Sequence, residues 1–299
     1  GNEKLERTAR FLASYIKEVT GTEVQTSTKE GKNSIILSVD PSVSSQKDGY
    51  ELNISSEKVT VKGSTEAGVF YGIQTIYKAL PITEGKALAS LPAGTVKDFP
   101  AYDYRGFMVD VGRHYFPVDY LKEIIDILAM HNINYFHWHL TEDQGWRIEI
   151  KKYPKLTEIG SHRKETITAP GSKEFDGKPV SGFYTQEEAK EIVNYAAERF
   201  ITVIPEVDMP GHMLAAVSNY EGVSCFNEPG WGSVFSSPVC PGKDSALEFC
   251  KNVYTELIAL FPYKYVHIGG DEVEKTNWKK CPDCQKRMHD NNLKTEEEL

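Results

Sequence analysis

Apolar positions in the first hundred residues follow helical spacing in some segments and strand-like spacing in others. A helical repeat near the N-terminus is formed by Leu5, Ala9, Leu12, Ile16 and Val19. Short runs rich in β-branched residues predict strands at 34–39, 51–54 and 58–62. Residues 64–80 predict a second helix with Ser64 as its N-cap. This order of elements predicts a small α/β layer.

Turn-forming residues follow this layer and predict a connecting segment. They are Pro81, Gly85, Pro92, Gly94 and Pro100. A stretch punctuated in this way is typical of a domain boundary, which we place near Tyr102. The sequence therefore predicts an N-terminal α/β domain with its linker over residues 1–101, and a second domain over residues 102–299.

Strand-like and helical runs alternate in the second domain. The strands are expected at 104–111, 135–140, 201–207 and 265–268. One intervening helix starts at Pro117, and two others open with the capping boxes 185–188 and 245–248. Because a helix between two strands supplies the crossover that a parallel pair requires, these units predict a parallel sheet covered by helices. A barrel and a doubly wound sheet both satisfy this pattern.

Composition narrows the class of protein. The chain has 299 residues, of which 40% are hydrophobic, and this is enough for a large buried core. A formal net charge of −9 offers no basic surface for nucleic acid, and no apolar run approaches the length that spans a bilayer. The expected partner is a small molecule or a glycan. The chain opens Gly1-Asn2-Glu3-Lys4 without a basic-then-apolar leader, so we expect that any export signal has been removed.

Polar residues collect where each strand of the second domain ends. They are Arg113 and His114, then His137, His139, Glu142 and Asp143, then Glu206, Asp208 and His212, and finally Asp271 and Glu272. In parallel α/β sheets the carboxyl ends of the strands form the binding edge. Any one of these residues alone is typical of a solvated surface or a helix cap. The repetition after four consecutive strands favours a functional site.

Four of these segments, in this order, resemble the glycoside hydrolase family 20 β-N-acetylhexosaminidases. They are Arg105-Gly-Phe-Met-Val-Asp-Val-Gly-Arg-His114, His137-Trp-His-Leu-Thr-Glu-Asp-Gln-Gly-Trp-Arg147, Pro205-Glu-Val-Asp-Met-Pro-Gly-His212 and His267-Ile-Gly-Gly-Asp-Glu272. The leading domain resembles the family through Gly68-Val-Phe-Tyr-Gly-Ile-Gln-Thr75. The resemblance implies an α/β fold, a (β/α)8 TIM-type barrel preceded by a small α/β domain. It also implies an exo-acting enzyme that removes terminal β-linked N-acetylhexosamine.

The resemblance assigns roles to the two adjacent carboxylates. Glu272 would be the general acid/base, and Asp271 would orient the 2-acetamido group of the substrate. The nucleophile would then be the acetamido carbonyl oxygen of the substrate, which departs from the usual scheme of two catalytic carboxylates. Such substrate-assisted catalysis needs no cofactor and no metal.

Four further residues match supporting positions of the family. Arg113 would hold the ring hydroxyls of the sugar, because its planar fork of donors suits vicinal oxygens. Asp208 and His212 match an acid–histidine pair that supports Glu272. Glu142 stands where the family often has Asp, and its carboxylate either binds the sugar or braces His212.

The five cysteines leave several interpretations open. They are Cys225, Cys240, Cys250, Cys281 and Cys284. The spacing of Cys281 and Cys284 is that of a zinc knuckle, but a second pair at matching spacing is missing, and His289 is a weak candidate. We therefore favour a local loop, or a disulfide to Cys225 or Cys240. Cys250 lies among apolar helical positions and is expected in the core.

The pattern also supports two rival functions. His137 and His139 at a strand end, with His212 and Asp271, are residue types of a metal-dependent barrel hydrolase. A non-catalytic glycan-binding fragment is the other rival, because only about the first four barrel strands are expected in this chain, and comparison with the family predicts that it is truncated. The resemblance favours an exported protein, and a homo-oligomer is compatible with the exposed sheet edges expected of half a barrel.

Overall fold

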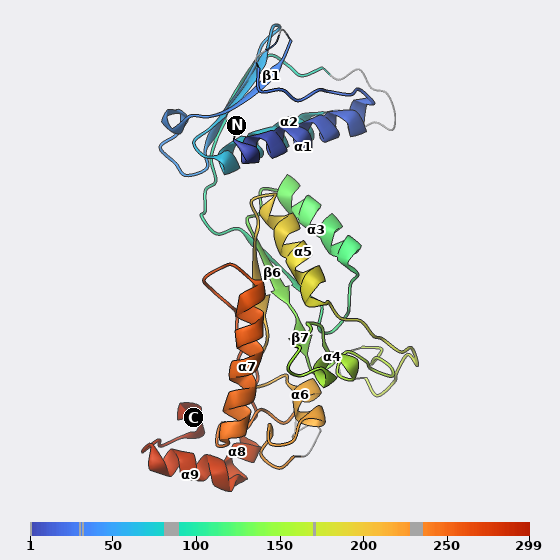
Figure 1. Ribbon diagram of the computed structural model, residues 1–299, viewed down its shortest axis with the longest axis vertical. Coiled ribbons are helices and arrows are strands. Elements are labelled where there is room, and N and C mark those ends of the chain that lie inside the picture. The colour runs from blue at the N-terminus through green and yellow to red at the C-terminus, as the bar shows by residue number, and fades with distance from the viewer. Residues whose placement is uncertain (1, 30, 32, 81–89, 170–171, 228–235) are drawn as a thin grey trace. The chain divides into compact units, whose positions relative to one another are not determined.

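The computed structural model describes residues 2–29, 31, 33–80, 90–169, 172–227 and 236–299 (Figure 1). Contacts divide the chain into two compact units. The first consists of Gly1–Gly106 with Ile124–Tyr135 and Ala196–Ile201, and the second of Phe107–Glu123, Phe136–Tyr195 and Thr202–Leu299. The division into domains at 101/102 stays a prediction, because two short later segments group with the first unit.

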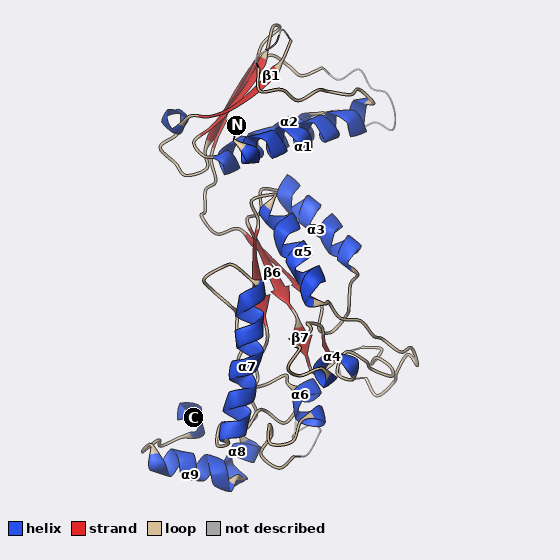
Figure 2. Cartoon of the chain, viewed as in Figure 1, coloured by secondary structure: helices blue, strands red, loops and turns tan. Residues whose placement is uncertain are grey.

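The first unit contains a four-stranded sheet with two helices along it (Figure 2). The strands β1 (Ile35–Val39), β2 (Tyr50–Ile54), β3 (Val59–Gly63) and β4 (Gly94–Asp98) lie in the order β1-β3-β2-β4. Strand β3 pairs in parallel with β1, whereas β2 is antiparallel to both β3 and β4. The helices are α1 (Glu3–Thr20) and α2 (Glu66–Ala79), and the 3-10 turn η1 covers Pro41–Val43. Helix α2 packs against α1 and the sheet.

Two predictions for this unit are wrong in detail. Helix α2 is capped by Thr65 and not by Ser64, because the Thr65 side chain accepts the hydrogen bond from the Gly68 N–H. The expected linker contains β4, which completes the sheet beside β2 and starts at Gly94. Of the turn residues predicted there, Pro81 and Gly85 lie outside the described residues.

The second sheet contains three of the four expected strands. The strands β5 (Gly106–Asp110), β6 (Tyr135–His139) and β9 (Thr202–Glu206) lie in the order β5-β6-β9. The backbone N–H of Tyr135 donates to Arg105 at one end of β5 and β6, and that of Val111 donates to His139 at the other. The bonded partners advance together along the two strands, from Arg105 with Tyr135 to Val111 with His139, so the pair is parallel. The N–H of Leu140 donates to Glu206, which brings the carboxyl ends of β6 and β9 together.

The expected fourth strand, 265–268, is not a regular strand. Its only bridge in the described chain is a parallel one between His267 and Glu206. Backbone hydrogen bonds from Val207 to His267 and from Met209 to Ile268 keep it beside the end of β9. The backbone then turns through Gly269 and Gly270, both at positive φ, which ends the extended conformation.

Helices separate the strands as the sequence predicts. They are α3 (Val118–Met130), α5 (Gln186–Ala197) and α7 (Asp244–Leu260), and they bury apolar faces such as Ala189, Ile192, Val253 and Leu257 (Figure 2). The capping box of α5 is confirmed, because Thr185 and Glu188 exchange hydrogen bonds between side chain and backbone. The one expected at 245–248 is wrong: α7 begins at Asp244, and the Ser245 hydroxyl donates to the Gly222 carbonyl instead.

Short elements complete the second unit. A hairpin of β7 (Thr141–Glu142) and β8 (Gly145–Trp146) follows β6. The remaining elements are α4 (Lys155–Glu158), α6 (Leu214–Asn219), α8 (Thr276–Lys280), α9 (Pro282–Asp290) and η2 (Glu296–Glu298). The protein therefore has an α/β fold. None of its described helices combines the length and apolar character needed to cross a membrane.

Candidate active site

The six predicted site residues follow the ends of neighbouring strands. Arg113 comes after β5, and Glu142 lies in the hairpin after β6. Asp208 and His212 come after β9, and Asp271 and Glu272 come after the segment that pairs with β9. The backbone order explains this clustering, because parallel strands end at the same edge of their sheet.

Arg113 is held at this edge by two carboxylates. Its guanidinium contacts Asp110 Oδ2 at 2.6 Å and Glu142 Oε1 at 3.0 Å. Burial alone would lower the pKa of Arg113, but the hydrogen bond to Asp110 and the charge of Glu142 outweigh it and raise that pKa. Half of the Arg113 side chain remains exposed (48%), so its other donors are open to a ligand. Gly112 permits the approach, because a Cβ there would lie 2.8 Å from Glu142 Cβ.

Glu142 joins Arg113 to His212. The Glu142 side chain is buried, and its Oε2 lies 2.9 Å from His212 Nδ1. Hydrogen bonds to Asp143 and Glu142 raise the pKa of His212 to about 10, so the ring is a cation with both nitrogens as donors at neutral pH. Glu142 thus contacts both His212 and Arg113, and its contact with the sugar stays a prediction.

His212 in turn faces Glu272. Its Nε2 lies 3.4 Å from Glu272 Oε2, and the Glu272 side chain is 55% exposed. Both residues have positive φ, 53° for His212 and 49° for Glu272. Residues other than glycine seldom adopt this conformation, and it is found preferentially at functional sites. We call the four residues joined by these contacts, Arg113, Glu142, His212 and Glu272, the charge relay row. It runs from a partly exposed cation to an exposed carboxylate.

Asp208 lies behind the two adjacent carboxylates. It is fully buried and accepts a hydrogen bond of 2.8 Å from the Gly270 N–H. Burial raises the pKa of Asp208 to about 6, and the negative charges of Asp271 and Glu142 act in the same direction. Gly269 has φ +62°, and a Cβ there would lie 2.2 Å from the Asp208 carboxylate. The two glycines thus allow the loop that carries Asp271 and Glu272 to close over Asp208.

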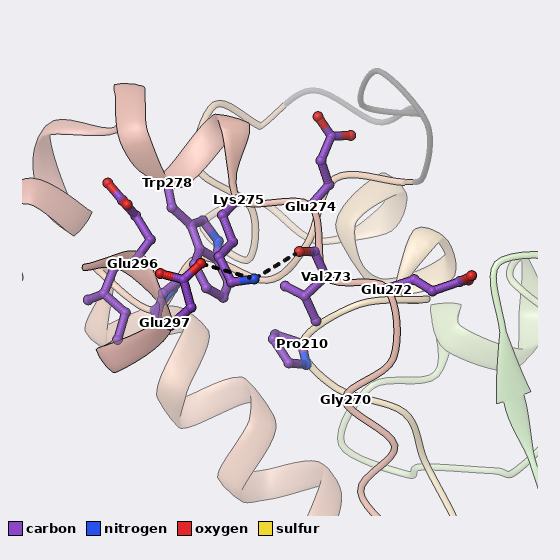
Figure 3. A pocket seen from close by; sticks show the side chains of 11 residues that line it. Pro210, Gly270, Glu272, Val273, Glu274, Lys275, Trp278, Glu296 and Glu297 are labelled. Carbon is purple, nitrogen blue, oxygen red and sulfur yellow. Dashed lines mark hydrogen bonds and ion pairs between the residues drawn. The ribbon is translucent and has the colours of Figure 1, made fainter.

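A cavity lies beside this loop and is lined in part by it. It has a volume of about 910 Å³ and is lined by residues that include Gly270, Glu272, Pro210, Trp278 and Glu297. Figure 3 shows Lys275 between Glu297 and the backbone of Val273, while the Glu272 side chain extends away from this group. Glu272 thus lines one side of this cavity, while its carboxylate faces His212.

Several supporting residues received no role from the sequence. Asp143 accepts hydrogen bonds from the Ser236 hydroxyl and the Leu214 N–H, and it helps to raise the pKa of His212. Arg147 is buried and donates to the carbonyls of Val111, Gly112, Ser161 and Gly182. Burial lowers its pKa to about 10. Their sequence signal is their place within the segment 137–147, where Asp143 also belongs to the polar residues at the end of the second strand.

The histidines of the metal-hydrolase rival separate into different groups. His137 Nε2 lies 2.6 Å from Glu206, and His267 Nδ1 lies 3.0 Å from the same carboxylate. His139 lies between Glu142 and Glu206. Among the described residues, no group of potential ligands contains Asp271, and none joins His137 to His212. The four-residue metal site proposed from the sequence is therefore wrong.

Comparison with known proteins matches both parts of the chain to one family. The family model "Glycosyl hydrolase family 20, catalytic domain" matches residues 102–299, and "Glycosyl hydrolase family 20, domain 2" matches residues 1–99. A β-hexosaminidase of Porphyromonas gingivalis is 45% identical over 99% of this chain and 38% of its own length.

Two solved structures show the same fold. The β-N-acetylhexosaminidase of Bacteroides fragilis has a TM-score of 0.78 and 39% identity, covering 95% of this chain and 54% of its own. An exo β-N-acetylglucosaminidase of Vibrio harveyi, solved in complex with N-acetylglucosamine, has a TM-score of 0.82 and 30% identity. It covers 99% of this chain and 46% of its own, so the chain spans about half the length of these relatives. The chain belongs to glycosyl hydrolase family 20.

Proposed function

We propose that the protein acts as an exo-β-N-acetylhexosaminidase, which removes terminal non-reducing β-linked N-acetylhexosamine from glycans with retention of configuration. The charge relay row is the observation that carries this proposal. It joins a partly exposed arginine, suited to sugar hydroxyls, to an exposed carboxylate through contacts of 3.0, 2.9 and 3.4 Å. The names of the Porphyromonas gingivalis and Bacteroides fragilis relatives support the same activity.

Glu272 is assigned as the general acid/base. Its carboxylate is exposed to an incoming substrate, while the His212 imidazolium holds it from one side. In the first step Glu272 gives its proton to the leaving-group oxygen as the glycosidic bond breaks. In the second step it takes a proton from the water that opens the cyclic intermediate. The acetamido carbonyl oxygen of the substrate supplies the nucleophile and becomes the ring oxygen of that intermediate.

Asp271 is assigned to orient the acetamido group. It is exposed, adjacent to Glu272 and close enough to Asp208 to raise the pKa of that buried acid. A carboxylate beside the acetamido N–H accepts its hydrogen bond and stabilises the positive charge that develops as the carbonyl oxygen attacks. The carbonyl oxygen of Asp271 is held close to Gly211, where a Cβ would lie 2.9 Å from it.

The remaining expectations join this proposal. The α/β fold is proposed to form a complete (β/α)8 barrel in the whole protein, in which β5, β6 and β9 are the first strands and 265–268 is part of the fourth. The V. harveyi complex with N-acetylglucosamine supports a glycan partner. Homo-oligomerisation stays a prediction of the sequence. An exported location stays a prediction of the sequence.

Two substitutions in the whole protein test the roles of the carboxylates. Glu272→Gln should slow hydrolysis of N,N′-diacetylchitobiose by about 10²–10⁴-fold and spare most of the activity on a 4-nitrophenyl glycoside, whose leaving group needs little protonation. Asp271→Asn should slow both substrates, because each needs an oriented acetamido group. Glu248→Gln, an exposed change on α7, is the matched control and should alter neither rate. Equal losses on both substrates for Glu272→Gln would refute its role as the acid.

A further inference from the structure

Four cysteines from distant parts of the second unit gather in its interior. We call Cys225, Cys240, Cys281 and Cys284 the cysteine cluster. Cys225 and Cys240 each follow one residue of the β-bridge between Ser224 and Val239. Cys281 and Cys284 lie at the start of α9. All four are buried, with exposures of 0–6%. The sequence missed this group, because no short spacing relates Cys225 or Cys240 to the knuckle at 281–284.

The sulfur atoms have the spacing of a tetrahedral metal site. Sγ of Cys240 lies 3.8 Å from that of Cys281 and 3.5 Å from that of Cys284. Sγ of Cys225 lies 3.8 Å from that of Cys284, and all four sulfurs fall within 4.8 Å of one another. With zinc–sulfur bonds of about 2.3 Å, the sulfurs of a regular tetrahedron lie about 3.8 Å apart. The cluster therefore needs almost no rearrangement to enclose a metal ion.

The backbone around the cluster is built for close approach. A Cβ on Gly242 would lie 2.3 Å from the Cys284 N, so only glycine fits beside this turn. Cys284 lies in the first turn of α9. The Lys243 ammonium donates to the carbonyls of Ser224 and Cys225 at 2.9 Å each, which places a positive charge beside the segment that carries Cys225. These features suit four thiolates around a dication, which together carry a net negative charge.

A disulfide does not account for the arrangement. All five cysteines are free, so the predicted bridge from the knuckle to Cys225 or Cys240 is wrong in this structure. Cys250 lies apart from the cluster in α7 and is only half-buried, and His289 is 89% exposed, so neither is a candidate ligand. A purely apolar packing role would not require four sulfurs to converge on one point, since thiols are weak donors and acceptors.

We propose that the cysteine cluster binds one zinc ion as a structural site. Four protein ligands would close the coordination sphere, which is typical of structural and not of catalytic zinc. The donor set of four thiolates in tetrahedral array selects zinc over magnesium or calcium. The zinc proposal follows from the positions of the four sulfurs and not from the composition, the family assignment or the proposed hydrolase activity.

Such a site would brace the segment behind the candidate active site. The chain around Cys240 is tied to α8 by the Trp278 indole N–H, which donates to the Val239 carbonyl at 3.1 Å, and by Asn277, which donates to Ser237. The same segment carries Ser236, whose hydroxyl donates to Asp143. Figure 1 shows α8 and α9 beside the start of α7, where Arg287 of α9 pairs with Asp244. Loss of the metal should therefore loosen α8, α9 and this support.

Metal content of the chain tests the proposal. Protein produced in zinc-supplemented medium and freed of loose metal by gel filtration should contain about one zinc per chain by plasma mass spectrometry. Cys284→Ser should reduce this to below about one tenth. Cys250→Ser is the matched control, because it removes a thiol outside the cluster, and it should keep the full zinc content. A zinc chelator should lower the unfolding temperature of the wild type and of the control.

A titration of the unsubstituted protein covers the case in which Cys284→Ser does not fold. Stepwise addition of a mercurial thiol reagent should release zinc to a metallochromic dye, with release complete at about four equivalents beyond those consumed by Cys250. Zinc released in this proportion supports the site. Iron at the same stoichiometry, a chain without metal whose four thiols react freely, or disulfide-linked cysteines found by mass spectrometry after alkylation without reduction would each overturn it.

Discussion

The two sheets of the molecule bury different kinds of side chain. The sheet of β1 to β4 and its helices bury mainly apolar groups such as Leu52, Val61, Phe70 and Ile73. At the carboxyl ends of β6 and β9 the buried groups include Glu142, Asp143, Glu206, Asp208 and His212. Burying charge costs free energy unless every group finds a partner, so a sequence that keeps it there does so for a purpose other than stability. The buried side chains of the first sheet therefore contribute mainly to stability, whereas those at the carboxyl ends of β6 and β9 form a cluster of charged groups.

A cavity in the first unit should break stability without altering the site. Phe70 is fully buried and packs edge-to-face on Phe11 with ring centroids 5.9 Å apart. Phe70→Ala should lower the free energy of unfolding by about 3–5 kcal/mol in denaturant titration, through lost burial and the cavity left behind. Below the transition, kcat/KM on a 4-nitrophenyl glycoside should stay unchanged. Phe99→Ala, at a 50% exposed position, is the control and should cost less than about 0.5 kcal/mol.

Removing a charge in the second unit should lower activity much more than stability. Glu142→Gln keeps the shape of the side chain but removes the negative charge between Arg113 and His212. We expect kcat/KM in the whole protein to fall about 10²-fold, which corresponds to about 2.7 kcal/mol of transition-state stabilisation. The free energy of unfolding should change by less than this. The pKa of His212 should fall toward its ordinary value, because Glu142 helps to raise it, and this can be followed by NMR of the ring protons.

The exposed change Glu191→Gln on α5 is the control for this variant. It should alter neither kcat/KM nor the titration of His212. If Glu142→Gln kept full activity while the His212 pKa fell, the charge relay row would be structural and the comparison between the two sheets would fail.

The smallest expected effect concerns Asp208. Its pKa is raised to about 6 in the folded protein, against about 4 when unfolded. Between these values the folded state binds a proton more tightly, so stability should fall as pH rises from about 4 to 6 and stay level above that. Asp208→Asn should flatten this slope, since the amide carries no charge to bury. The free energy of unfolding of the variant relative to that of the wild type should therefore be roughly 1–2 kcal/mol higher at pH 7 than at pH 4. Parallel unfolding curves of the two proteins at every pH would contradict this.

Local pattern was enough to predict most elements and the edge of the sheet at which the candidate site residues lie. Helical and strand-like spacing of apolar residues predicted α1, β1 to β3, β5, β6 and β9, because each element buries one face and its period appears directly in the sequence. The same logic predicted that Arg113, Glu142, Asp208, His212 and the two terminal carboxylates lie at one edge, since parallel strands end together. Strand β4 was missed because its residues are all exposed and show no alternation.

What only the tertiary structure decided is which of these groups touch. The sequence alone determined that Glu142 and His212 lie at neighbouring strand ends, but their 2.9 Å contact depends on a hairpin and a positive-φ turn that no apolar period encodes. The four buried cysteines are likewise separated by up to 59 residues and meet only when α9 packs beside the loop after α6. Periodicity records the neighbours of a residue along its own element, whereas contacts between elements arise from packing of the whole chain.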